Sequence, residues 1–172
     1  LEEVGRLHVW YLPLVKGHPI ADGALKSYTD IWRNLLPQGW SVPVSLTLFD
    51  YHVDNLLLLS DRSGVAACGL LDFQDSVCGP ITYDLMSLLE DARRDIDPEL
   101  VNGMKYRYLS AFPKISKDSF EISWAIMAAQ RHVRVIGTFA RLKLRDGKPH
   151  YLDHMPRLWR YMDNCLHHPA LA

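Results

Sequence analysis

The sequence has few cysteines, no long apolar run and almost no net charge, and each of these absences argues against a class of protein. The only cysteines, Cys68, Cys78 and Cys165, are odd in number and fit no metal-ligand spacing. We therefore expect no disulfide framework and a reducing, cytoplasmic compartment. No apolar run reaches the ~20 residues of a membrane-spanning helix, and we expect no signal peptide. A formal net charge of −1 favours neither nucleic acid nor an anionic membrane as partner.

The composition is that of an ordinary globular protein, with 48% hydrophobic residues. The length of 172 residues predicts a single domain, 1–172, large enough for a real core. Apolar residues at helical spacing predict a mainly helical α+β chain. Asp22 and Asp97 are expected as helix N-caps and Pro37 as a helix stop. The expected helices cover Leu1–Val15, Ala24–Leu36, Asp84–Arg94, Pro98–Phe112, Asp118 or Ser119 to Leu144, and Pro156–Leu166.

The stretch from Leu48 to Asp84 contains two acidic clusters joined by a predicted β-hairpin. A short strand, Val44–Phe49, is expected just before it. A hairpin brings its two ends together, so Asn55 and Asp72 should be neighbours. The clusters are Asp50–Asn55 and Asp72–Asp75, and the hairpin strands are Leu56–Leu59 and Val65–Leu71, with the turn signal Asp61-Arg62-Ser63-Gly64 between them.

These residue types suit phosphoryl transfer. That reaction needs a carboxylate to orient the attacking hydroxyl and accept its proton, and Mg²⁺ to bridge the nucleotide phosphates. Asp50 suits the base. Asn55 and Asp72 suit the metal, because Mg²⁺ prefers oxygen ligands, including one or two carboxylates.

Other interpretations of the same acids stay open. If the first cluster were a strand, Asp50, His52 and Asp54 would share one face, as in a metal-dependent hydrolase that also uses Asp72. No second His cluster with ligand spacing supports this, so His52 is expected to bond loop backbone. Asp84 is expected to cap a helix or to accept backbone N–H bonds from the catalytic loop.

At these residues the sequence resembles the aminoglycoside phosphotransferase/choline kinase family, whose fold is protein-kinase-like. Asp50, His52 and Asn55 match its HGDxHxxN-type loop, Leu71-Asp72-Phe73 matches its metal-binding strand end, and Gly79 with Asp84-Leu85 matches its GxxxxDL element. The resemblance implies that Asp50 is the catalytic base, that Asn55 and Asp72 hold Mg²⁺, and that His52 and Asp84 support the loop.

A narrower resemblance, over 42–161, is to the bacterial N-acetylmuramate/N-acetylglucosamine 1-kinases of cell-wall recycling. It implies an ATP-dependent kinase acting on a sugar hydroxyl, most simply the anomeric one. The alternatives are another small acceptor such as an aminoglycoside or choline, the metal-dependent hydrolase, or a non-catalytic kinase-like binding domain. The N-acetylmuramate/N-acetylglucosamine 1-kinases usually have Arg directly before the catalytic Asp, where this chain has Phe49.

The resemblance also implies a partner within the parent chain. The family has an N-terminal lobe that covers the nucleotide, and nothing in this sequence supplies it. We therefore expect the C-terminal lobe alone, with ATP and Mg²⁺ as cofactors and little or no turnover by the isolated chain.

Acceptor contacts are expected from the loop after Asp72 and from the longest predicted helix. The candidates are Gln74, Asp75, Arg131 and Arg134, since sugar hydroxyls want bidentate polar groups and a carboxylate or lactyl group would want Arg. Taken singly, Arg131 and Arg134 are also explained as solvated charges or partners of helix acids. Asp75 is as well explained as a solvated acid.

Overall fold

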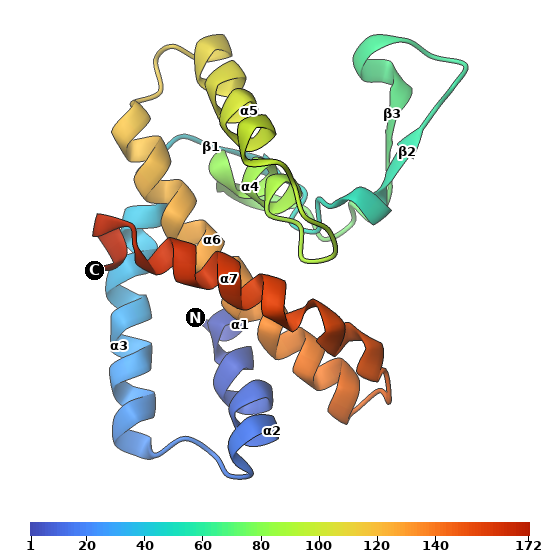
Figure 1. Ribbon diagram of the computed structural model, residues 1–172. Coiled ribbons are helices and arrows are strands. Elements are labelled where there is room, and N and C mark those ends of the chain that lie inside the picture. Colours follow the sequence, from blue (N-terminus) through green and yellow to red (C-terminus); the bar gives the residue numbers. More distant parts are fainter.

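The computed structural model describes all residues, 1–172, and most of them are helical (Figure 1). The α-helices are α1 (Glu2–Arg6), α2 (Leu12–Lys16), α3 (Asp22–Gly39), α4 (Thr82–Leu89), α5 (Pro98–Ala111), α6 (Lys117–Leu144) and α7 (Met155–Leu166). A π-helical segment, Leu7–Tyr11, joins α1 to α2. Short 3₁₀ segments cover Val53–Asn55, Gly64–Ala67, Pro149–His154 and Pro169–Leu171. No helix is both long and apolar enough to span a membrane.

Helix α6 is the centre of the fold, and α1, α3, α4 and α7 pack against it. Every residue from Ser123 to Arg134 is buried, so the middle of this 28-residue helix is enclosed on all sides, whereas its first and last residues are exposed. Phe120, Trp124, Met127, Ala128 and Phe139 are buried there, as the sequence pattern predicts. The helix therefore links these four helices through the core.

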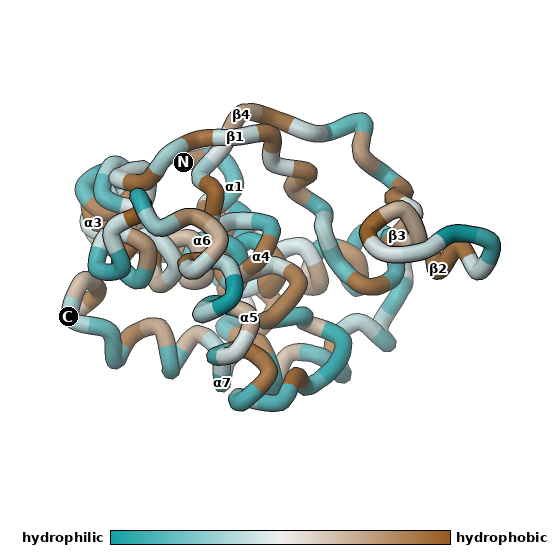
Figure 2. Tube along the Cα trace, turned by 90° about the horizontal axis from the view of Figure 1, so that it is seen from above, coloured by the Kyte–Doolittle hydropathy of each residue, from teal (hydrophilic) through white to brown (hydrophobic).

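Two small antiparallel sheets lie beside the helices. Strand β1 (Val44–Thr47) pairs with β4 (Val77–Pro80), with Val44 opposite Pro80 and Thr47 opposite Val77. Strand β2 (Leu56–Leu58) pairs with β3 (Cys68–Leu70) as a hairpin. In Figures 1 and 2 this hairpin extends away from the helical body, on the side opposite α3. The mainly helical α+β class is confirmed.

Several expected strand and helix ends were wrong. The first strand ends at Thr47, because the chain turns at Phe49, where φ is 71°. Val65 lies in a 3₁₀ turn, so the second hairpin strand begins only at Cys68. Helix α4 ends at Leu89, because Glu90 leaves the helical conformation with ψ of 49°.

The expected helix signals at prolines and caps had mixed outcomes. Asp97 caps α5 by accepting a hydrogen bond from the Glu99 N–H at 2.8 Å, as predicted. Asp22 is instead the first residue of α3 and makes no capping bond. Pro37 lies inside the last turn of α3 rather than ending it, where a missing N–H costs only one helical bond. Helix α6 starts at Lys117, with Ser116 as its cap.

Candidate functional site

The loop that follows β1 is fixed by one carboxylate from α4. Asp84 Oδ2 accepts a hydrogen bond from the Leu48 N–H at 2.7 Å, and its Oδ1 accepts one from the Phe49 N–H at 3.1 Å. Burial raises the pKa of Asp84, and the two backbone N–H bonds act in the opposite direction. Asp84 therefore holds the backbone just before Asp50, in the geometry expected of a support for the loop.

Asn55 closes the other end of the loop. Its Nδ2 donates to the Asp50 carbonyl oxygen at 2.9 Å and lies 3.4 Å from His52 Nε2. The Leu71 N–H donates to the Asn55 carbonyl oxygen at 2.9 Å, which places Asp72 at the next position along the chain. The predicted pairing of the two hairpin ends is therefore present in the backbone.

Asp72 is exposed and has a left-handed backbone, with φ of 55°. Its Oδ1 accepts a hydrogen bond from Gln74 Nε2 at 2.6 Å. Such backbone strain in a non-glycine residue is concentrated at functional sites. Phe49 and Asp72 are the two non-glycine residues with positive φ, and they lie at the two acidic clusters.

The Asp50 carboxylate is held from the side by α6. Arg134 donates from its terminal Nη2 to Asp50 Oδ1 at 3.0 Å, and the Arg134 side chain is 9% exposed. The same guanidinium lies 4.2 Å from the centroid of the Phe49 ring, which stacks on Tyr83 at 5.3 Å. Phe49, where an Arg was expected, therefore forms a packing platform for an Arg that comes from another helix.

A recess of about 390 Å³ opens beside Asp50 and carries several charges of both signs. Two of the predicted acceptor contacts, Asp75 and Arg134, line it. Gln74 and Arg131 do not. The lining residues are Glu3, Arg6, Phe49, Asp50, Asp75, Val77, Arg134 and Arg141.

Arg131 is buried and points elsewhere. It is 2% exposed, and its Nη1 donates to the Glu90 carbonyl oxygen at 3.2 Å. In this structure it supports the chain that leaves α4, and its contact with an acceptor stays a prediction.

The acids of the hydrolase interpretation do not converge. Asp54 forms an ion pair with Arg93 at 2.8 Å, and His52 lies next to Asn55. Burial lowers the pKa of His52, which keeps it suited to hydrogen bonding within the loop. The expected bond from His52 to the loop backbone is absent: its Nε2 faces the Asn55 side chain, and its Nδ1 has no partner.

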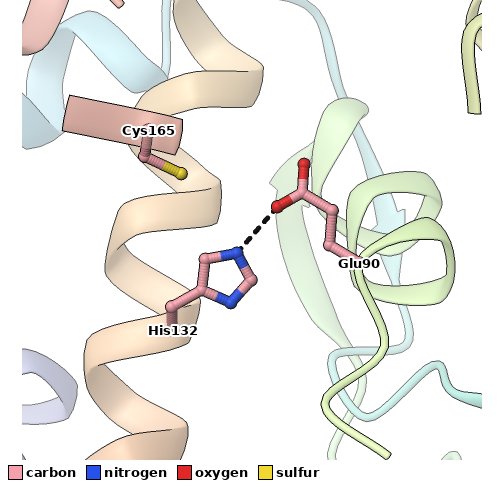
Figure 3. A group of neighbouring side chains, drawn as sticks. All are labelled: Glu90, His132 and Cys165. Carbon is pink, nitrogen blue, oxygen red and sulfur yellow. Dashed lines mark hydrogen bonds and ion pairs between the residues drawn. The ribbon is translucent and has the colours of Figure 1, made fainter. Parts of the chain in front are cut away.

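A second polar cluster lies between α4, α6 and α7 (Figure 3). The ligand atoms of Glu90, His132 and Cys165 lie within 4.8 Å of one another. Both Glu90 oxygens are already used, by His132 Nε2 at 2.7 Å and by Trp124 Nε1 at 2.6 Å. Burial raises the pKa of the Cys165 thiol, which disfavours the thiolate that a metal would need. We interpret the cluster as a buried hydrogen-bond link.

Sequence reasoning missed the ring of charges around Asp50. Arg134 was named as an acceptor contact, but its bond to Asp50 joins residues 84 positions apart. Arg6 and Arg141 were not singled out. The one available signal was the spacing of Arg134, Thr138 and Arg141, which places all three on one face of a helix.

Comparison with known proteins finds one matching family and several relatives that share one name. Residues 5–117 match the model of the phosphotransferase enzyme family. A protein of Caulobacter vibrioides is 42% identical over 149 residues, which is 87% of this chain and 41% of that protein. A Pseudomonas putida protein is 32% identical over 99% of this chain and 51% of its own length. A Neisseria meningitidis protein is 34% identical over 94% of this chain and 49% of its own length. All three are named N-acetylmuramate/N-acetylglucosamine kinase, and the chain spans about half the length of these relatives.

Proposed function

Since the chain belongs to the phosphotransferase enzyme family, we propose that it is the catalytic and acceptor-binding lobe of an ATP-dependent kinase that phosphorylates a sugar hydroxyl. The finer proposal takes the acceptor from the relatives' names. It is the anomeric hydroxyl of N-acetylmuramate or N-acetylglucosamine. The resemblance predicted from the sequence is confirmed at the level of the family.

The observation that carries the proposal is the fixed position of Asp50. Asp84 and Asn55 bond the backbone on either side of it, and Arg134 holds Oδ1. This leaves Oδ2 without a protein partner at the wall of a recess. A general base must lie within hydrogen-bond reach of the proton that it accepts, and a fixed carboxylate at a recess meets that requirement.

Asn55 and Asp72 fit a magnesium ion by the chemistry of their free atoms. The Nδ2 of Asn55 is bonded within the loop, so its Oδ1 remains free to act as a ligand to a cation. Asp72 supplies an exposed carboxylate at the paired end of the hairpin. Mg²⁺ takes oxygen ligands of this kind and, when bound, would neutralise charge on the nucleotide phosphates.

We also propose that a second, N-terminal lobe of the same parent chain covers ATP. The chain spans about half the length of its relatives, and neither acidic cluster offers a glycine-rich phosphate loop. Accordingly, the isolated 172-residue chain should bind ATP weakly and transfer little phosphate.

The test uses the full-length parent protein with Mg-ATP and four acceptors: N-acetylmuramate, N-acetylglucosamine, choline and an aminoglycoside. Phosphorus NMR should show a sugar 1-phosphate. Asp50→Asn should lower its rate of formation by about 10²- to 10⁴-fold, the usual contribution of general base catalysis. Asp54→Asn is the matched control, because Asp54 lies in the same loop but pairs with Arg93.

Three outcomes would contradict the proposal. Full activity of Asp50→Asn would remove Asp50 as the base. Failure of the parent protein to bind Mg-ATP at all would reject a kinase, and binding of ATP without product from any acceptor would favour a non-catalytic kinase-like domain.

A further inference from the structure

We propose that the Asp50 recess contains a carboxylate subsite, in which Arg141 binds the acid group of the acceptor and makes the enzyme prefer N-acetylmuramate to N-acetylglucosamine. This inference rests on the proposed function. It adds the residue that discriminates between the two sugars.

Two of the three arginines that line the recess already have partners. Arg134 is bonded to Asp50 at 3.0 Å, and Arg6 is bonded to Glu3 at 2.9 Å and to Thr138 at 3.1 Å. Arg141 lines the same recess but forms no ion pair or side-chain hydrogen bond, and its Nε is buried without a partner. A guanidinium with no neighbouring acid leaves its positive charge without a partner, so an anion that entered the recess would stabilise this position.

The acid closest in sequence is already engaged elsewhere. Asp146 follows α6, and Arg145 binds its two oxygens at 2.7 Å and 3.2 Å. Arg141 is therefore the cation of the recess without an ion pair, and Asp75 is the acid of the recess without one.

Arg141 lies on the same face of α6 as Arg134, nearer the C-terminal end of the helix. Arg134, Thr138 and Arg141 follow the i, i+4, i+7 spacing of one helix face. At a rise of 1.5 Å per residue, Arg141 lies about 10 Å beyond Arg134 along the helix axis. Arg134 lies at the end of the recess where Asp50 would meet the reacting hydroxyl. Arg141 therefore lies toward the opposite, distal end of the recess. A sugar that reacts at C1 and carries a substituent at C3 can extend between these two ends.

The two sugars differ in charge. N-acetylmuramate is N-acetylglucosamine with a lactyl ether at C3, and that ether ends in a carboxylate. N-acetylglucosamine is neutral. Arg offers a planar pair of N–H donors that matches a carboxylate, and such charge-assisted bonds are stronger than neutral ones. An unpaired Arg at the distal end therefore selects for the acid.

The experiment measures kcat/KM of the full-length parent protein for both sugars, with the substitution Arg141→Gln. The expected result is a loss of about 10- to 100-fold for N-acetylmuramate, as for one charged hydrogen bond, and a change within about twofold for N-acetylglucosamine. Arg141→Lys should give an intermediate loss, because it keeps the charge without the fork. Arg145→Gln is the matched control at the same end of α6 and should change neither value.

Each alternative result has its own meaning. An equal loss for both sugars with a raised KM for ATP would assign Arg141 to the nucleotide phosphates and overturn the inference. An unchanged ratio between the sugars would overturn it as well. A parent protein that phosphorylates neither sugar would instead reject the proposed function. Calorimetric binding of each sugar to Arg141→Gln gives a readout that does not depend on turnover.

Discussion

At the scale of single residues, the shape of the loop depends on one half-buried carboxylate. Asp84 satisfies two backbone N–H groups that have no other acceptor, and it does so from a different element of the chain. Removal of the Asp84 carboxylate would therefore lower the free energy of unfolding by leaving two backbone N–H donors without partners.

Asp84→Ala should destabilise the protein by about 1–3 kcal/mol for each of the two N–H groups left unsatisfied. It should also lower kcat, because Asp50 loses its fixed backbone. Urea unfolding followed by tryptophan fluorescence gives the first value, and steady-state kinetics the second.

Asp97→Ala is the matched control for that substitution. Asp97 also accepts a backbone N–H, from Glu99 at 2.8 Å, but it is an exposed helix cap away from the recess. It should cost about 1 kcal/mol and leave kcat unchanged. Equal effects of the two substitutions on kcat would contradict a specific role for Asp84.

The residues of the site were predictable where the signal is local. Asp50, Asn55, Asp72 and Asp84 lie within one short stretch, and the hairpin between them follows from apolar runs and a turn signal. Their chemical roles remain proposals.

The arginines around Asp50 could not be predicted from a local pattern. Arg134 reaches Asp50 from α6, and Arg6 lines the recess because α1 packs on α6, and no spacing in the sequence shows either arrangement. Arg6 and Arg141 were missed for this reason.

At the scale of elements, the crossing of the N-terminal helical segment over α6 depends on one glycine. A Cβ added at Gly137 would lie 2.3 Å from the Arg6 carbonyl carbon and 2.5 Å from its oxygen. These are backbone atoms, so the two segments would have to separate. Thr138, the next residue, accepts the hydrogen bond from Arg6.

Gly137→Ala should therefore destabilise the protein by about 1–3 kcal/mol, the usual cost of overpacking. Gly103→Ala in α5 is the control, because a Cβ there meets nothing within 4 Å. This second change should stabilise by about 0.5–1 kcal/mol, since Ala is the better helix former. Thermal unfolding of both variants gives the comparison, and a stabilising Gly137→Ala would show that the crossing is looser than described.

Helical periodicity predicts elements better than it predicts their ends. The long helix and its buried stripe followed from the apolar spacing, whereas strand β4 was missed. That strand offers only Val77 and Cys78 ahead of Gly79 and Pro80, which is too short a pattern to recognise. The early end of α4 also had no local signal, because Glu90 leaves the helix to meet His132 and Trp124 on α6.

At the scale of the whole molecule, the Glu90–His132 link joins the end of α4 to α6, and Tyr161 of α7 stacks on His132 at 5.3 Å. Burial lowers the pKa of His132, so the folded protein keeps its imidazole neutral. The unfolded chain binds a proton near the ordinary histidine pKa of about 6.5. Unfolding is then favoured as the pH falls through that value.

The free energy of unfolding should accordingly decrease as the pH falls below about 6.5, and His132→Gln should make that slope smaller. Burial raises the pKa of Glu90, but its hydrogen bonds to His132 and Trp124 outweigh that effect, so the net shift of the Glu90 pKa is downward, away from the histidine range. His8, His52 and His154 have lowered pKa values as well, so the informative quantity is the difference in slope between the two proteins.

Urea unfolding at several pH values measures that slope. His18→Gln, at an exposed histidine that bonds only the neighbouring Pro19 carbonyl, controls for the loss of a surface imidazole. Identical slopes for wild type and His132→Gln would show that His132 titrates alike in the folded and unfolded chains.

The length of helix α6 makes the position of Arg141 sensitive to a tilt of the helix. One end is anchored where Ser123 donates to the Gly39 carbonyl oxygen at 2.6 Å and meets Thr82 at 2.7 Å. From Ser123 to Arg141 the helix spans about 27 Å, so a tilt of about 5° at the anchor would displace Arg141 by about 2 Å. A displacement of ~1 Å is enough to impair catalysis. Substitutions of buried residues far from the recess can thus change the acceptor preference by moving Arg141, although none of the residues that line the recess is replaced.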